Sequence, residues 1–466
     1  MLQKSIAALA LSALSLCAQN VDRTKAPATP PIPSYKLPPV FQTKLPNGLA
    51  IEIVEDARFP LVTARVNFMA GSKFDPAAMP GLAEAVATLL NEGTKTRSSR
   101  QISEETDAIG GGLGASAGPD SLTVVGNSLS ENLPKMLDLV ADITLNANFP
   151  QNEVSLYQQN RIQSLRQEHS QSSFLAAEKM AQVAYGSSPY AHIGPTAEAV
   201  QKLDPKTLTQ FRDTYLVPNN ATLILIGKLP ARAELMALLT KQFGVWQQKP
   251  LPPATRIEPP APHRQIVLVD RPGSVQADIH VGRLAPIRTT SEYFPLTVGN
   301  NILGGGTNSR MFQDIREREG FAYDAHSEYA TNREAATLSA VTEVRNEVIE
   351  PALKAVLAEM DKLATTKVEA EELTNVKNYM AGLYLLRLET QDGLATQLNN
   401  MKTLGLPDNY LETYTTRVRS VEPDQILAVG AKYLATGQAA IVVVGDASKI
   451  ADALKKFGDV TIAKAN

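Results

Sequence analysis

The feature that most constrains the fold of this chain is an internal duplication. Tyr215 and Tyr433 each stand 12 residues before a glycine (227 − 215 and 445 − 433). In both cases that glycine closes a short apolar stretch, at 222–226 and at 440–444. Short runs of aliphatic and β-branched residues are typical of buried strands. The same strand and its flanking residues therefore occur twice in the chain.

Two further matches follow in the same order and at a similar offset. Val62–Val66 alternates like Val275–Ile279, and the helical pattern at 133–143 corresponds to that at 351–363. Three matches in one order predict two homologous halves. Between the halves, residues 249–263 carry six prolines, which indicates an exposed linker.

The periodicity of apolar residues predicts an α+β fold. Strand patterns occur at 50–54, 62–69, 122–127, 222–226, 266–269, 276–281, 336–342 and 440–444. Helix patterns occur at 81–92, 99–109, 131–146, 151–185, 231–243, 294–303, 308–317, 347–363, 368–388 and 423–433. Long helices beside several strands predict that each half is a mainly antiparallel sheet packed with helices.

The beginning of the chain has the features of an export signal. Lys4 precedes an apolar run from Ile6 to Leu16, which Cys17 and Ala18 follow. This run is too short to span a membrane, and no later segment reaches about 18 consecutive apolar residues. We therefore expect a secreted or periplasmic protein without a membrane span. A lipid anchor on Cys17 is the less favoured alternative, because Leu16 stands where a small residue would be needed.

These patterns divide the 466 residues into five segments. They are a signal peptide at 1–18, a Pro-rich tether at 19–39, a first domain at 40–248, a linker at 249–263 and a second domain at 264–466. Cys17 is the only cysteine, so no internal disulfide can form. The net charge of −3 gives no indication of a nucleic-acid partner.

One helix in the first domain resembles the metal-binding helix of a peptidase family. The stretch 80–94 places Leu82 and Val86 on a core-facing stripe and Glu84 and Thr88 on another face. Its frame of Gly-Leu-Ala, Leu-Leu and Glu-Gly-Thr is similar to that of the pitrilysin/insulinase-type (inverted zincin) metallopeptidases. In that family the frame carries H-x-x-E-H, in which two histidines bind zinc and the glutamate is the general base.

The resemblance also shows where this chain departs from the family. It aligns Glu84 and Thr88 with the two histidines, Ala87 with the catalytic glutamate and Ser164 with the third ligand. Alanine cannot ligate, and threonine and serine are poor zinc ligands. The resemblance thus implies a degenerate zinc site and no metal on this chain. Glu84 is interpreted as a solvated or salt-bridged carboxylate.

The histidines of the chain give no local metal signature. No two of the five lie within one helical turn; they are His169, His192, His263, His280 and His326. A site assembled from residues distant in sequence remains an alternative.

The second half keeps the other part of the family's active centre. Residues 301–323 contain a Gly-rich turn, then Ser-Arg-Met-Phe, and are similar to the family's C-terminal segment. The resemblance implies that Arg316 and Tyr323, seven residues apart, bind the substrate backbone and stabilise the oxyanion. Arg318 is the alternative if the register differs by two. Without the resemblance, the arginines would be a solvated helix face and the tyrosine the start of a strand.

The resemblance as a whole implies a zinc-less subunit of the mitochondrial-processing-peptidase-like branch of the family. It would be one subunit of a heterodimeric endopeptidase, inactive alone, that offers Arg316 and Tyr323 to a zinc-bearing paralogous subunit and an extended peptide substrate. Zinc is expected on the partner only. Two alternatives stay open: an inactive structural or peptide-binding homologue, and a stand-alone metallopeptidase with an unconventional metal site.

Overall fold

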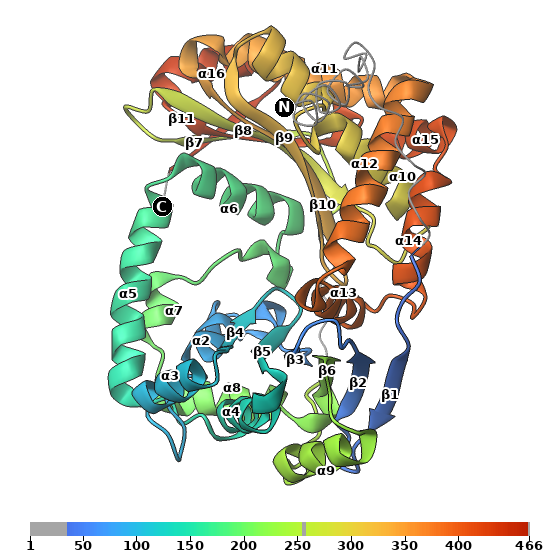
Figure 1. Cartoon of the computed structure of the whole chain (residues 1–466). Helices are drawn as coiled ribbons and strands as arrows, with labels where there is room; N and C mark the ends of the chain where they lie inside the picture. The colour runs from blue at the N-terminus through green and yellow to red at the C-terminus, as the bar shows by residue number, and fades with distance from the viewer. Residues whose placement is uncertain (1–34, 254–257, 465–466) are drawn as a thin grey trace, which may run out of the picture. The chain divides into compact units, whose positions relative to one another are not determined.

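The protein contains two six-stranded sheets, one in each half of the sequence. A computed structural model describes residues 35–253 and 258–464 (Figure 1). In spatial order, the first sheet consists of β1 (Val40–Lys44), β2 (Ala50–Glu55), β6 (Ala221–Gly227), β3 (Leu61–Phe68), β5 (Leu122–Leu129) and β4 (Gly112–Ala117). The second consists of β12 (Val460–Lys464), β7 (Gln265–Asp270), β11 (Ala440–Gly445), β8 (Gln276–Ala285), β10 (Ala336–Arg345) and β9 (Ala322–Thr331).

The two sheets repeat one topology, which confirms the predicted duplication and the α+β class. β6 and β11 are equivalent central strands; each runs parallel to one neighbour, β2 or β7, and antiparallel to the other, β3 or β8. Most strand pairs are antiparallel, as the sequence predicts. The outermost strands differ, because β1 joins the first sheet from the start of the domain whereas β12 joins the second from its end.

Helices from the same half cover one face of each sheet. In the first half these are α2 (Leu82–Leu89), α3 (Ser99–Ala108), α4 (Leu133–Asn146), α8 (Pro205–Tyr215) and α9 (Arg232–Phe243). In the second half they include α10 (Tyr293–Gly304), α11 (Ile349–Thr365), α12 (Ala370–Leu388), α14 (Tyr410–Arg419), α15 (Pro423–Tyr433) and α16 (Ala447–Leu454). The core is aliphatic and closely packed, with residues such as Val66, Leu137 and Leu353 fully buried.

The opposite face of each sheet is covered by a helix from the other half. α6 (Ser172–Tyr185) belongs to the first half but lies on β8 and β11, and α13 (Gln391–Leu404) lies on β3 and β6 (Figure 1). Leu175 of α6 packs with Val444, while Leu398 of α13 shares a buried cluster with Ile224. Because of this exchange the halves belong to one unit rather than two.

The predicted elements were wrong at several places, one of which follows from the exchange. The single helix predicted at 151–185 is two helices, α5 (Gln151–His169) and α6, because the backbone is extended at Gln171 and α6 turns onto the second sheet. The segment predicted as a helix at 308–317 contains a short π-helix, η5 (Phe312–Arg318). Sequence patterns also missed all four edge strands of the two sheets, β1, β4, β9 and β12. β4 is rich in Gly, Ala and Ser, and β9 carries several charges, so neither has a strong strand propensity.

The predicted signal peptide at 1–18 and most of the tether lie outside the described residues. No helix in the described part of the chain is both long and apolar enough to cross a membrane.

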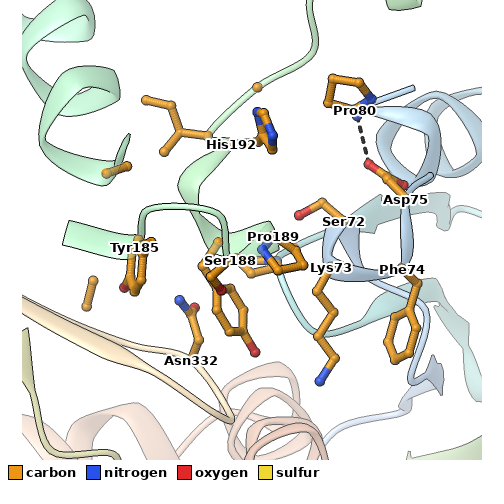
Figure 2. Close-up of a pocket in the computed structure, with 18 of the residues that line it drawn as sticks. Ser72, Lys73, Phe74, Asp75, Pro80, Tyr185, Ser188, Pro189, His192 and Asn332 are labelled. Atoms are coloured by element: carbon orange, nitrogen blue, oxygen red, sulfur yellow. Dashed lines mark hydrogen bonds between the residues drawn. The ribbon is translucent and has the colours of Figure 1, made fainter. Parts of the chain in front are cut away.

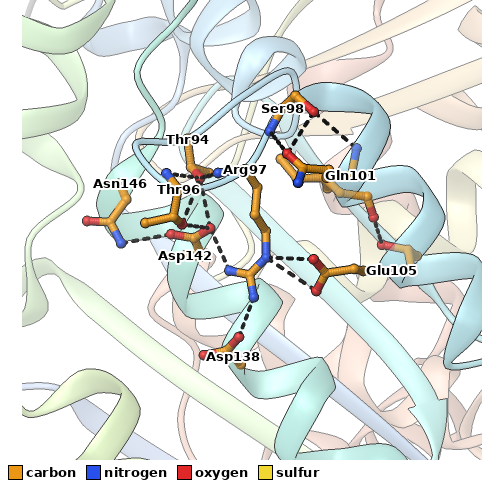
Figure 3. Close-up of polar contacts among 11 residues, drawn as sticks. Thr94, Thr96, Arg97, Ser98, Gln101, Glu105, Asp138, Asp142 and Asn146 are labelled. Atoms are coloured by element: carbon orange, nitrogen blue, oxygen red, sulfur yellow. Dashed lines mark hydrogen bonds and ion pairs between the residues drawn. The ribbon is translucent and has the colours of Figure 1, made fainter.

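A charged network holds the loop that follows α2. Arg97 binds Asp142 (Nη1–Oδ2, 2.8 Å) and Asp138 (Nη2–Oδ2, 2.7 Å) on α4, and Glu105 (Nε–Oε1, 3.2 Å) on α3 (Figure 3). Burial would raise the pKa of Asp142, but hydrogen bonds from Arg97, an asparagine and two threonines lower it overall. The network therefore fixes the loop and favours the ionised form of Asp142.

We expect Arg97→Ala to lower the free energy of unfolding by about 2–3 kcal/mol, because it leaves half-buried carboxylates without their cation. Arg100→Ala is the matched control, since Arg100 is 84% exposed and pairs weakly with Glu104 (3.6 Å). Arg100→Ala should lower the free energy of unfolding by less than about 0.5 kcal/mol. Urea denaturation measures both, and equal losses would show that the network does not stabilise the loop.

Candidate active-site remnant

The helix with the metal-binding frame is fixed at its N-terminus by Asp75. This carboxylate accepts hydrogen bonds from the backbone N–H groups of Gly81 (2.7 Å) and Ala83 (2.8 Å). Burial raises the pKa of Asp75 to about 7, although the backbone N–H groups oppose the shift. Gly81 has a positive φ of 89°, and a side chain there would collide with Pro195. α2 therefore begins at a defined place and orientation.

The four positions aligned with zinc chemistry offer no metal-binding set. Ala87 is buried and presents only a methyl group, while Thr88 and Ser164 are exposed. Glu84 forms an ion pair with Arg161 of α5, with Nε and Oε1 2.8 Å apart. Within the described residues, no three His, Cys, Asp or Glu side chains are arranged to hold a metal ion. The donor set present here does not fit zinc.

Glu84 faces a cavity of about 750 Å³ that both halves line. The first half contributes the turn before α2, the end of β4, and α6 with the segment that follows it. The second half contributes β8, β9 and β10. Figure 2 shows Tyr185 on one side of this cavity and Phe74 and Asp75 on the other. A cavity of this size with polar groups on several walls is typical of a binding site.

A buried carboxylate closes one end of the cavity by joining the two halves. Asp120, in the turn after β4, accepts hydrogen bonds from the Tyr190 hydroxyl (2.6 Å) and from the backbone N–H of Arg333 (2.7 Å), in the turn after β9. Lys73 lies 3.4 Å from Asp120 and 2.9 Å from Glu334. The turns that end the two edge strands are thus held against each other.

The sheet of the second half places a buried histidine in the cavity wall. His280 on β8 lies in register with Val341 on β10, which is in register with His326 on β9. Burial lowers the pKa of His280 to about 4, so its imidazole is neutral at pH 7. His326 lies 2.7 Å from Asp324 and 3.5 Å from Glu328, and these carboxylates raise its pKa.

Arg316 and Tyr323 lie together on the second half. The Arg316 guanidinium stacks on the ring of Tyr323 (5.0 Å) and on that of Phe312 (4.5 Å). Tyr323 is 85% exposed, so its hydroxyl is available to another molecule. Arg318, the alternative in the other register, instead pairs with Asp314 at 2.8 Å. Arg316 belongs to the π-helical segment, a geometry that often occurs at functional sites.

The structure does not bring this pair to the frame on α2. Neither Arg316 nor Tyr323 lines the cavity that Glu84 faces. On β9 the first cavity-lining residue is Glu328, five residues beyond Tyr323, or roughly 16 Å along the strand. In this structure the pair therefore lies outside the cavity that Glu84 faces.

Sequence reasoning missed several residues of this region. Arg161 and Asp120 each bind a partner more than 40 positions away, and His280 is set apart only by its burial in the sheet, so no local spacing marks these residues. Asp75 could have been found, because an acidic residue shortly before a helix is a common N-terminal signal.

Comparisons with known proteins agree with this architecture. The family model of insulinase (peptidase family M16) matches residues 51–191, and that of the peptidase M16 inactive domain matches residues 202–380. Among relatives, a Bacillus subtilis protein described as an uncharacterized zinc protease is 24% identical over 74% of this chain and 83% of its own length. A similarly described protein of Mycobacterium bovis is 23% identical over 90% of this chain and 96% of its own.

Solved structures show the same fold. A peptidase M16 inactive domain from Pseudomonas fluorescens has a TM-score of 0.81 at 24% identity, covering 87% of this chain and 98% of its own. A protease from Helicobacter pylori has a TM-score of 0.82 at 19% identity, covering 88% and 100%. With both family models matching in order along the chain, this protein belongs to the insulinase family, peptidase family M16.

We expect His280 to make stability fall as the pH is lowered. Its pKa is about 4 when folded and about 6.5 when unfolded, so the unfolded chain binds more protons between these values. The free energy of unfolding should therefore decrease from pH 6.5 to 4, by up to about 1.4 kcal/mol per pH unit for this group. His280→Gln should remove this contribution.

Urea denaturation at pH 7 and pH 4.5 tests the expectation through the difference between wild type and variant. Asp278, whose pKa burial raises to about 6, titrates in the same window but is present in both proteins. His192→Gln is the control, since His192 is exposed. An unchanged pH dependence in His280→Gln would contradict the buried neutral imidazole.

Proposed function

We propose that this chain is the zinc-lacking subunit of a two-chain endopeptidase. A paralogous subunit with an intact H-x-x-E-H motif would hold zinc and activate water, and this chain would present Arg316 and Tyr323 to the bound peptide. We also propose that the complex works outside the cytoplasm, because Lys4 and the apolar run to Leu16 have the features of an export signal.

One observation carries the proposal: Tyr323 is exposed and braced by Arg316, while the chain's own zinc positions lack ligands. Tyr323 is 85% exposed, so its hydroxyl is free to contact a substrate held by another chain. Neither residue of the pair lines the cavity that Glu84 faces, which favours a role at a site on another chain. A surface pair of this kind suits a second subunit.

The chemistry of the pair fits peptide hydrolysis. A tyrosine hydroxyl and a guanidinium are hydrogen-bond donors, and both stabilise the negative charge that develops on the carbonyl oxygen under attack. The stacked ring holds the guanidinium in place before the substrate binds. One such donor is worth about 10²–10³ in kcat in well-studied hydrolases.

The edge strands suit an extended peptide substrate. In the described residues, β4 and β9 each pair with only one strand, so each leaves a row of backbone groups free along its outer side. An extended peptide can add to such an edge as a further strand. Binding through the peptide backbone would account for recognition of unfolded segments of varied sequence.

We expect peptidase activity when this protein is mixed with an H-x-x-E-H paralogue encoded in the same genome, and none from either chain alone. In the mixture, Tyr323→Phe should lower kcat by about 10²–10³-fold with little change in KM, because the hydroxyl acts on the transition state. Tyr379→Phe is the matched control, since Tyr379 is also exposed, on α12. Cleavage of a fluorogenic peptide measures each.

The other outcomes separate the alternatives. If the mixture forms a complex whose activity is the same with Tyr323→Phe and with Arg316→Ala, this chain is a structural or peptide-binding subunit. If the purified chain alone cleaves peptides and loses this activity with a chelator, it is a stand-alone metallopeptidase.

A further inference from the structure

The contact between α2 and α5 contains a cation that belongs to the chain itself. Arg161 of α5 reaches across to Glu84 of α2 (Nε–Oε1, 2.8 Å) and also binds Glu168, two turns further along α5 (Nη1–Oε1, 2.7 Å). Its side chain is only 14% exposed, so the guanidinium is largely shielded from water. A charge in this setting must be compensated, and two carboxylates surround it.

The Arg161 guanidinium lies between the two helices whose residues align with the family's metal ligands. Glu84 aligns with the first metal-ligating residue of that frame, and Arg161 stands one helical turn before Ser164, which aligns with the last. In a family member with an intact H-x-x-E-H motif, a metal ion would connect the helices that correspond to α2 and α5. The buried hydroxyl of Tyr157 also lies beside this pair; burial, and then Glu84, raise its pKa.

The same geometry disfavours a divalent ion. The nearest acidic groups, Glu84 and Glu168, each already accept a hydrogen bond from Arg161. A metal ion beside them would meet the positive guanidinium, and Thr88 and Ser164 offer no imidazole or carboxylate to offset that repulsion.

We infer that the Arg161 guanidinium takes the place of the metal as the cation that joins α2 to α5. An ion pair within the chain then connects the two helices in place of a metal ion and its ligands. Arg161 is a positioning residue, because it fixes the helix that borders the cavity and contacts no reacting atom. This inference does not depend on a partner subunit, so it can fail or hold separately from the proposed function.

The test compares Arg161→Met with the double variant Arg161→Met/Glu84→Gln. Methionine keeps an apolar stem but removes the charge, so Glu84 loses its partner. We expect amide hydrogen exchange in α5 to become about tenfold faster in the single variant, as the helix opens more often. Neutralising Glu84 should restore most of the protection, because Glu84 is the carboxylate on the facing helix, whereas Glu168 lies on α5 itself and is partly exposed to solvent.

Two measurements complete the test. Arg166→Met, an exposed arginine on the same helix, should leave exchange unchanged. The denaturation midpoint of the wild type should not move with added Zn²⁺ or with a chelator. The inference is overturned if Glu84→Gln does not rescue Arg161→Met, which would show that only packing of the stem matters. It is also overturned if zinc raises the midpoint of the wild type.

Discussion

The structure depends on the exchange of helices between its two halves. Each sheet leaves one face uncovered by its own half, and that face is buried only when α6 or α13 arrives from the other half. The cavity, the junction at Asp120 and the position of Glu84 all follow from this arrangement. Burial of aliphatic surface provides the main driving force, at about 25 cal/mol per Å² removed from water. The halves therefore act as one folding unit.

The duplicated architecture could be derived from sequence because it rests on local patterns. The stretches 222–226 and 440–444 are strongly apolar and form central strands that are almost completely buried. The break between α5 and α6 could not be derived, since α6 is a good helix former whose direction is set by a sheet distant in sequence. The sequence pattern did not predict β4 and β9 for a related reason, because edge strands need less apolar sequence than central strands.

The residues of the candidate site also divide into those that the sequence predicts and those that it does not. The missing zinc ligands and the spacing of Arg316 and Tyr323 can be read from motifs, since those residues are close in sequence. The ion pair of Glu84 with Arg161 joins residues 77 positions apart, and nothing in the sequence marks it. The structure also shows what spacing alone could not, that Arg316 stacks on Tyr323, that Tyr323 is exposed and that neither residue lines the cavity.

The charges along β9 have a consequence for self-association. Asp324, His326 and Glu328 occupy alternate positions on β9, an edge strand of the second sheet that pairs on one side only in the described residues. If two copies paired antiparallel through this edge about His326, Asp324 of each would stand opposite Glu328 of the other, and like charges directly opposed are unfavourable. Charged side chains are a common means of preventing edge strands from polymerising. This edge thus discourages fibre-like growth between identical molecules and still admits a strand of different composition.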